Sequence, residues 1–507
     1  KINPLKKDYS EITDLKNKAQ KIIELNNEIK PLVQAINAEK EKSIGMYANV
    51  NKNTSVTPTV TPGITTMNNS GTIHLKDESS VGMYIKNELD DRTKAVINNN
   101  ASNGIIKIDK AESVGIMADT ATVQNDGIIE VKDNKSAGIY AIDNSYVTNN
   151  ADITTEGEKS AGIYISDSDV VNNASKTITV DKNKSAGIYG KFKNDKDHTI
   201  TNSGIITLAT SNSEKGSAGI YGELESGATK TLSIGNSTGS TINVGMKESV
   251  GIYAKNSSAN GKGNLVVDNS GTVITSKEKS VGIFGEKATV ANNKTIEVNG
   301  QESIGIFGEL GSEIKNTSTN EGIKVTGESS TGMYATGLGT TGENTGKIVS
   351  SGERATGMGA ADSAVITNEK EISGIVKNVI GMYGTGTGTK VTNSKEITLS
   401  GKTSTGIFTK NGAEGVNDLA GTIDLTGEKG VGMFGMTDAT SPASAINLQN
   451  KGEINLNSEV STGIFTSNAN TAITNSTVSN TGTINLNKAK GVGIFTPKSN
   501  VTSVGEI

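Results

Sequence analysis

The chain has 507 residues, a formal net charge of −5, 60 glycines, 6 prolines and no cysteine. Apolar residues make up 33% and aromatic residues only 4%, which is too little to fill the cores of an ordinary enzyme of this length. Without cysteine there are no disulfides or thiolate sites, and an acidic balance with only two arginines makes nucleic acid an improbable partner.

Residues 1–42 differ in character from the rest of the chain. Their apolar residues recur at spacings of three and four, as in an amphipathic helix or coiled coil. These are Ile12, Leu15, Ala19, Ile22, Ile29, Val33 and Ile36, with Asn26 in the same series. The pattern predicts a helix from about Asp8 to Ile29, a kink near Pro31 and a shorter helix to about Glu41. Two roles stay open: an α-helical cap over the first strands, which we favour, or a coiled coil that joins chains.

From residue 43 onward the sequence repeats to its last residue, Ile507. The repeated motif is Ser, a small or β-branched residue, Gly, Ile or Met, and an aromatic residue, as in residues 136–140 and 280–284. It occurs 17 times at steps of 23 to 37 residues, and 15 of the 18 aromatic residues occupy its last position. We expect the Ile or Met to face the core and the rings to form a ladder on the alternate face. Whether that ladder faces in or out stays open.

Two further short strands separate successive motifs. One alternates apolar and polar residues, as in 176–180 and 421–425, and the other has a β-branched residue two positions before an Asn. Strands this short cannot pair within one repeat, so each must pair with its counterpart in the next. The sequence therefore predicts an all-β fold, a right-handed parallel β-helix of about 17 coils over residues 43–507. Since the chain starts with Lys1 and ends in mid-repeat, we expect a fragment of a longer protein.

A row of asparagines follows Val or Ile by two positions. Its members are Asn98, Asn125, Asn149, Asn172, Asn202, Asn236, Asn269, Asn292, Asn316, Asn368, Asn393 and Asn475. They could form a row of amides that binds a ligand. A structural ladder, in which each amide bonds the turn of the next coil, is the better interpretation.

Extra residues fall mostly at one place in the repeat, between the aromatic strand and the Asn strand. They include 86–92, 191–198, 223–231, 255–263 and 436–445. Three of these insertions belong to consecutive repeats, so we expect adjacent loops on one edge and a binding surface there. Its candidate residues are Phe192, Lys193, Asp195, His198, Glu223, Glu225, Lys230, Lys255 and Lys262. Phe192 is the expected anchor, as an exposed ring with no role in the repeat.

Catalysis is not indicated by any motif. The repeated Ser lacks the Gly-x-Ser-x-Gly setting of a nucleophile elbow, and 17 copies cannot be served by two histidines, His74 and His198. Acidic residues are scattered, and the calcium-binding nonapeptide of β-rolls is missing. We therefore expect no enzyme activity and no metal or cofactor.

The repeats that read Lys-Ser-Ala-Gly-Ile-Tyr and Glu-Ser-Val-Gly-Ile-Tyr, with Asn-Ser-Gly-Thr-Ile between them, resemble a known family. Residues 43–507 are similar to the passenger domains of the large fusobacterial type V autotransporter adhesins, the group that includes RadD and the galactose-inhibitable adhesin. The resemblance implies a β-helix displayed at the outer surface of the cell, which binds bacterial or host receptors of protein or glycan. It also implies membrane attachment only through a C-terminal barrel that this sequence lacks.

Two functions remain possible at this point. The segment is an adhesin passenger that mediates cell–cell adhesion through its edge loops or N-terminal tip, or it is a passive stalk that extends a tip elsewhere. A stalk would show no saturable binding to cells.

Overall fold

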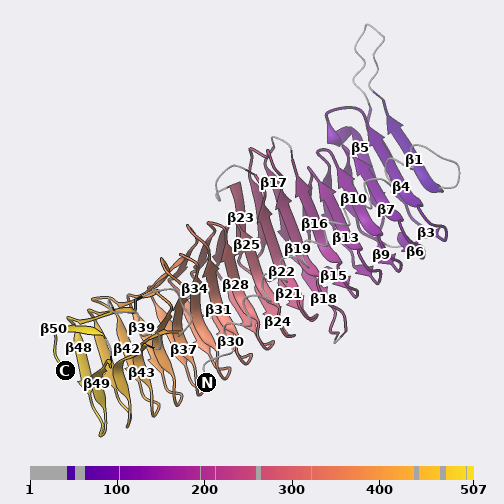
Figure 1. The fold of residues 1–507 in the computed structure, drawn as a ribbon. Helices are drawn as coiled ribbons and strands as arrows, with labels where there is room; N and C mark the ends of the chain where they lie inside the picture. The colour runs from indigo at the N-terminus through magenta and orange to yellow at the C-terminus, as the bar shows by residue number, and fades with distance from the viewer. Residues whose placement is uncertain are drawn as a thin grey trace. The chain divides into compact units, whose positions relative to one another are not determined.

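The computed structural model describes residues 43–51, 63–101, 103–193, 196–211, 213–258, 264–320, 322–438, 445–468, 476–497 and 499–507. Residues 1–42, and with them the predicted cap or coiled coil, lie outside this set. The described chain divides into two compact units, 43–280 and 281–507. Both are built from coils of three short strands (Figure 1).

In unit 43–280 the strands form three parallel sheets. The first sheet contains β1 (Ile44–Val50), β4 (Val81–Asn87), β7 (Val114–Asp119), β10 (Ala137–Ile142), β13 (Ala161–Ser166), β16 (Ala186–Phe192), β19 (Ala218–Leu224) and β22 (Val250–Asn256). The second contains β2 (Thr65–Asn69), β5 (Ala95–Asn99), β8 (Thr122–Asn125), β11 (Tyr146–Asn149), β14 (Asp169–Asn172), β17 (His198–Asn202), β20 (Leu232–Asn236) and β23 (Leu265–Asn269). The third contains β3 (Thr72–Leu75), β6 (Ile105–Ile108), β9 (Ile128–Val131), β12 (Ile153–Thr155), β15 (Thr177–Val180), β18 (Ile205–Leu208), β21 (Thr241–Val244) and β24 (Thr272–Thr275). One 3-10 turn, η1 (Arg92–Lys94), precedes β5.

Unit 281–507 repeats the same plan. Its first sheet contains β25 (Val281–Glu286), β28 (Ile304–Glu309), β31 (Thr331–Thr336), β34 (Thr356–Ala361), β37 (Ile380–Thr385), β40 (Thr405–Lys410), β43 (Val431–Thr437), β46 (Thr462–Asn468) and β49 (Val492–Phe495). The second contains β26 (Thr289–Asn292), β29 (Glu313–Asn316), β32 (Thr341–Asn344), β35 (Val365–Asn368), β38 (Lys390–Asn393), β41 (Glu414–Asn417), β44 (Asn447–Asn450), β47 (Thr477–Asn480) and β50 (Asn500–Ser503). The third contains β27 (Thr295–Val298), β30 (Ile323–Val325), β33 (Lys347–Ser350), β36 (Glu371–Gly374), β39 (Glu396–Leu399), β42 (Thr422–Leu425), β45 (Glu453–Leu456) and β48 (Thr483–Leu486).

Each strand pairs in parallel with its counterpart in the next coil, as the repeat predicts. In the first sheet, for example, Ile139 pairs with Ile163 and Ile163 with Ile188, and all three are fully buried. The predicted stack of this position continues in register through Ile220 and Ile252. The all-β parallel β-helix is therefore confirmed, and the repeated Ile position lies inside it.

The repeated Ser and Gly have structural roles at the corner that leads into the first sheet. The hydroxyl of Ser160 accepts a hydrogen bond from the backbone N–H of Ser136 in the previous coil, and both residues are buried. A Cβ at Gly219 would lie 2.6 Å from the carbonyl oxygen of Gly251 and 2.8 Å from Ile242. The Gly thus leaves room for the backbone of the next coil rather than for an aromatic ring, and the Ser is not available as a nucleophile.

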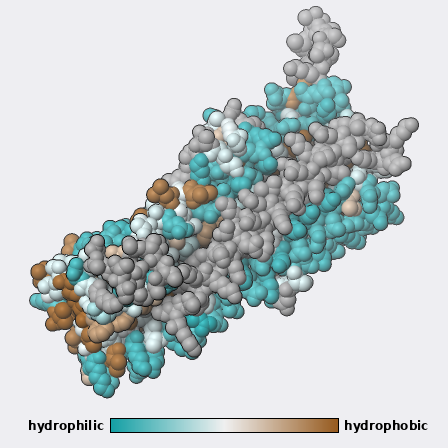
Figure 2. All heavy atoms as spheres, viewed as in Figure 1, coloured by the Kyte–Doolittle hydropathy of each residue, from teal (hydrophilic) through white to brown (hydrophobic). Residues whose placement is uncertain are grey.

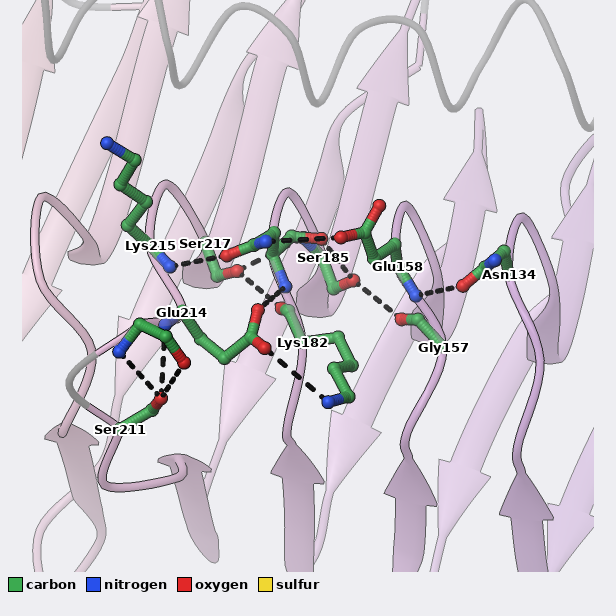
Figure 3. A network of polar contacts seen from close by, with 11 residues as sticks. Asn134, Gly157, Glu158, Lys182, Ser185, Ser211, Glu214, Lys215 and Ser217 are labelled. Atoms are coloured by element: carbon green, nitrogen blue, oxygen red, sulfur yellow. Dashed lines mark hydrogen bonds and ion pairs between the residues drawn. The ribbon is translucent and has the colours of Figure 1, made fainter.

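Polar contacts also link the exposed turns at this corner from coil to coil (Figure 3). The side-chain oxygen of Asn134 accepts a hydrogen bond from the backbone N–H of Glu158, at 2.7 Å. Glu214 accepts one from the backbone N–H of Asn183 at 3.2 Å and pairs with Lys182 at 3.4 Å. The charged corner residues are thus part of the coil stack.

The asparagines form a ladder inside each unit. The predicted bonds to the backbone of the next coil are present in unit 281–507, as from Asn316 to the carbonyl of Lys347 at 3.2 Å, and bonds between the amides themselves join them. In unit 43–280 each amide nitrogen donates to the amide oxygen of the Asn in the next coil at 2.7–2.9 Å, from Asn69 through Asn99 to Asn269. A second series runs from Asn292 to Asn480. The prediction of Asn98 is wrong, because Asn99 is the buried member, and Asn475 lies outside the described residues.

The last coil of unit 281–507 has apolar residues at its surface. Leu486 is 41% exposed and Phe495 52%, whereas Leu456 in the preceding coil is 1% exposed. In Figure 2, brown spheres lie at this end of the unit among white and teal ones. Among the described residues, no helix is long and apolar enough to cross a membrane.

Candidate functional site

The three consecutive insertions of unit 43–280 lengthen the strands at their corner before they form loops. The strands β16, β19 and β22 have seven residues each, and β17, β20 and β23 have five. Phe192 pairs in register with Leu224, and His198 pairs with Leu232. The insertions therefore extend two sheets of the β-helix by one inward-facing residue per strand.

This extension overturns the predicted exposure of the anchor residues. Phe192 is 1% exposed, His198 3% and Glu223 5%. Because side chains alternate along a strand, Ile188, Gly190 and Phe192 share the inward face, so Phe192 adds a layer to the core. The ring of His198 lies beside it, with ring centroids 5.0 Å apart. Phe192 is thus a packing residue and cannot serve as an exposed anchor.

Glu223 and Glu225 lie in a cluster of partly buried charges on the opposite face of the first sheet. Glu223 accepts hydrogen bonds from the hydroxyls of Tyr221 at 3.1 Å and Ser257 at 3.0 Å, and pairs with Lys255 at 3.4 Å. Glu225 pairs with Lys191 and, at 3.2 Å, with Lys193. Both carboxylates are therefore compensated within the insertions.

A second cluster joins the earlier insertion at η1 to the start of β17. Its centre is Asp169, which pairs with Arg92 at 3.3 Å and His198 at 3.4 Å and accepts the backbone N–H of Thr199 at 2.8 Å. Burial raises the pKa of Asp169, but the hydrogen bonds from His198, Thr199 and Arg92 outweigh it, so this pKa lies below its usual value. The guanidinium of Arg92 also lies over the ring of Tyr146, 5.0 Å from its centroid.

This Asp169 cluster was not predicted. It unites one of the two arginines, one of the two histidines and the two off-repeat aromatic residues of the β-helix. The rarity of these residue types was a signal, but Arg92 and Asp169 are 77 residues apart in the chain. Only the stacking of the coils brings them together, and the cluster braces two insertions against each other.

Only some of the predicted site residues lie at the surface of the insertions. Lys193 and Lys230 are exposed, whereas the side chains of Glu225 and Lys255 are only 16% and 12% exposed. Asp195 and Lys262 lie outside the described residues. The exposed part of the predicted site is therefore the two lysines and the turn residues around them.

The aromatic residues of the motif form the ring ladder, which in unit 43–280 comprises Tyr140, Tyr164, Tyr189, Tyr221 and Tyr253. Successive rings are stacked with centroids 4.7–5.1 Å apart. Both flat faces of an inner ring are thus covered by its neighbours, which leaves none for a sugar or a base. Burial raises the pKa of Tyr164, Tyr189 and Tyr221 well above the usual value. The rings are at most 3% exposed, so the ladder is buried rather than an open stripe.

The remaining question for the described part of the chain is whether its residues could bind a metal ion. There, no group of three His, Asp or Glu residues is placed to hold a metal ion. His74 pairs with Asp109 at 2.5 Å on the exposed face of the third sheet.

Comparison with known proteins places these coils in a family. A family model described as the BigA third pectate lyase-like domain matches residues 24–151 and again residues 136–371, which together exceed half of the chain. No curated protein matches the chain. The match supports a β-helical domain of the bacterial surface-adhesin type. The chain belongs to the family of BigA third pectate lyase-like domains.

Proposed function

We propose that the chain is the surface-displayed passenger of a type V autotransporter adhesin of the fusobacterial group, and that it mediates adhesion to other bacteria or to host cells. The observation that carries this proposal is the set of three insertions in consecutive coils, which changes one edge of an otherwise repetitive β-helix. Uniform coils offer every site equally, whereas adjacent loops on a rigid scaffold can distinguish one receptor.

The contact surface in this proposal is the exposed turn of the insertions, with Lys193 and Lys230 as its charged groups. The residues beneath it hold the turns in place: Phe192 and Leu232 by packing, and the partly buried Glu225 by pairing with Lys191. Exposed lysines suit an acidic receptor, either a protein or a glycan with carboxylate groups. The proposal assigns no catalytic step or cofactor, and turnover of a polysaccharide by the purified chain would contradict it.

Charge reversal tests the contact surface. The double variant Lys193→Glu and Lys230→Glu is expected to lower saturable binding of the purified chain to bacterial or host cells by at least ~10-fold, since two attractive contacts become repulsive. The matched control is Lys76→Glu with Lys110→Glu, two exposed lysines of the same unit outside the insertions. Equal binding by both variants and the wild type would refute the role of the insertions.

A passive stalk is the second candidate, and the regularity of unit 281–507 favours it there. The coils from β28 to β40 have six-residue first strands and short turns, with no long insertion. If wild-type chain shows no saturable binding to any cell, the stalk is the better description of the whole segment.

A further inference from the structure

In unit 43–280 the repeated motif forms an unbroken series of side chains that can give up one electron. The chain has no cysteine and no tryptophan, so its phenols and thioethers are the side chains that one-electron oxidants attack most readily. Centroids of successive rings lie 4.7–5.1 Å apart in the stack from Tyr140 to Tyr253. Before this stack, Met117 pairs in register with both Tyr84 and Tyr140. The series therefore runs without a gap from Tyr84 to Tyr253.

The series has an exposed entrance in β1. Tyr47 is 53% exposed, and the centroid of its ring lies 5.3 Å from that of Tyr84. Tyr47 and Tyr221 are six coil steps apart, or about 29 Å at ~4.8 Å per step. Because electron tunnelling falls off exponentially with distance, transfer in six short steps is far faster than one transfer over the whole distance. An electron vacancy formed at Tyr47 can thus move along the coils toward Tyr221.

Tyr221 differs from its neighbours in having a base for its proton. A phenol that loses an electron becomes a strong acid, so the radical is stabilised where a base lies within hydrogen-bond reach. The carboxylate of Glu223 accepts a hydrogen bond from the hydroxyl of Tyr221 at 3.1 Å, and its ion pair with Lys255 at 3.4 Å favours the ionised form that can take up a proton. The hydroxyl of Tyr189, by contrast, has no hydrogen-bond partner among the described residues.

We propose that this series is a relay that takes up one oxidising equivalent at Tyr47 and stores it at Tyr221. A one-electron oxidant, such as a hydroxyl or peroxyl radical, gains an electron from Tyr47, whose phenol releases its proton to water. Electrons then pass along the series toward Tyr47, which regains a proton from water. Tyr221 supplies the last electron, its O–H bond breaks and the proton moves to Glu223, which leaves a neutral tyrosyl radical beside a carboxylic acid. This redox role is independent of the adhesive role proposed above.

Flash oxidation of the full chain tests where the radical is stored. Because the chain has no cysteine, Asn49→Cys at an exposed position of β1 can carry a single ruthenium polypyridyl label, which a flash and a soluble quencher convert to a one-electron oxidant close to Tyr47. Freeze-quench EPR should detect a long-lived neutral tyrosyl radical. This signal should be lost in Tyr221→Phe and in Glu223→Gln, and retained in Tyr253→Phe, the matched control in the same stack. A signal of unchanged amplitude and lifetime in Tyr221→Phe would overturn the proposal.

A second variant of the labelled chain tests the path and keeps every stacked ring. It removes three consecutive phenols of the series: Tyr140→Phe, Tyr164→Phe and Tyr189→Phe. Four coil steps without an oxidisable side chain, about 19 Å at ~4.8 Å per step, then separate Met117 from Tyr221, so the radical at Tyr221 should be lost. The matched control removes three phenols outside the series and should retain it: Tyr146→Phe, Tyr334→Phe and Tyr383→Phe. A Tyr221 radical that forms equally in both variants would refute the relay.

Discussion

The coils from β16 to β23 and those from β28 to β40 connect the strand of the first sheet to the strand of the second sheet in two different ways. In the bare coils, a turn with left-handed residues such as Leu310, Asp362 or Asn411 joins a six-residue strand to a four-residue strand. In the inserted coils both strands are one residue longer and the added residues pair in register. The Asn ladder continues in both, and so does the stacked inward position of the motif, which is Ile in the inserted coils and Ile or Met in the bare ones.

The difference teaches how this fold accepts insertions. Added residues that keep the alternation of the strand find an inward position, as Phe192 and Leu224 do, and a charged residue on the other face finds a partner in the next coil. Glu223 lies in register between Lys191 and Lys255. The inserted corner therefore gains its own small core and its own ion pairs, and exposes little besides its turns.

The largest expected effect comes from a charge placed in the core that both kinds of coil share. Ile188→Asp in an inserted coil and Ile306→Asp in a bare coil should each cost on the order of 5 kcal/mol, because each buries a carboxylate without a partner. Urea unfolding and limited proteolysis measure the loss. Thr207→Asp, on the outer face of the third sheet, is the control and should be nearly neutral. Wild-type stability of Ile188→Asp would contradict the inward assignment.

Phe192→Ala separates packing from recognition in the inserted coils. Because the ring is buried against His198, its removal should lower the free energy of unfolding by about 4 kcal/mol. Lys193→Ala, at the exposed neighbouring position, should change stability by less than ~0.5 kcal/mol. An unchanged unfolding curve for Phe192→Ala together with lost cell binding would restore Phe192 as an anchor.

Removing one Asn from the ladder should cost more stability where the neighbouring amides have no second hydrogen-bond partner. In Asn149→Ala, the amide nitrogen of Asn125 and the oxygen of Asn172 lose their described partners, at a cost of about 3 kcal/mol. In Asn202→Ala, Asn172 can still donate to the carbonyl of Lys176 and Asn236 can still accept from Ser240, so about 1 kcal/mol is expected. Equal losses in urea unfolding would show that these side contacts contribute nothing.

What recurs in the sequence could be predicted, and what occurs once could not. The inward Ile position repeats in register, and the structure confirms it for Ile139, Ile163 and Ile188. The ladder members Asn344 and Asn417 were missed because Gly342 and Gly415 stand where a β-branched residue was required. Phe192 was predicted to be exposed because it lies outside the repeated motif. The alternation of side chains along the strand from Ile188 would have placed it on the inward face. The Asp169 cluster depends on which coils lie adjacent, and no local pattern contains that information.

The smallest expected effect is a pH dependence that distinguishes Asp119 from Glu223. Both lie at the same position of the first sheet, but Asp119 has Lys86 on one side and Ile142 on the other, whereas Glu223 has a lysine on each side. Burial, and then repulsion from Asp143, raises the pKa of Asp119 from 3.8 to about 6. An isolated acid of this kind is disfavoured in its charged form.

The sign of the effect follows from this raised pKa. Below about pH 4, Asp119 is protonated in the folded and the unfolded chain and the fold keeps its full stability; between pH 4 and 6 the unfolded chain ionises first, so stability falls as pH rises. Asp119→Asn should therefore melt higher than wild type above pH 6 and equally below pH 4. Ile142→Lys should have a similar effect, since it supplies the second lysine that Glu223 has. Asp77→Asn, at an exposed turn, is the control, and a constant difference across the pH range would rule out Asp119 as the source.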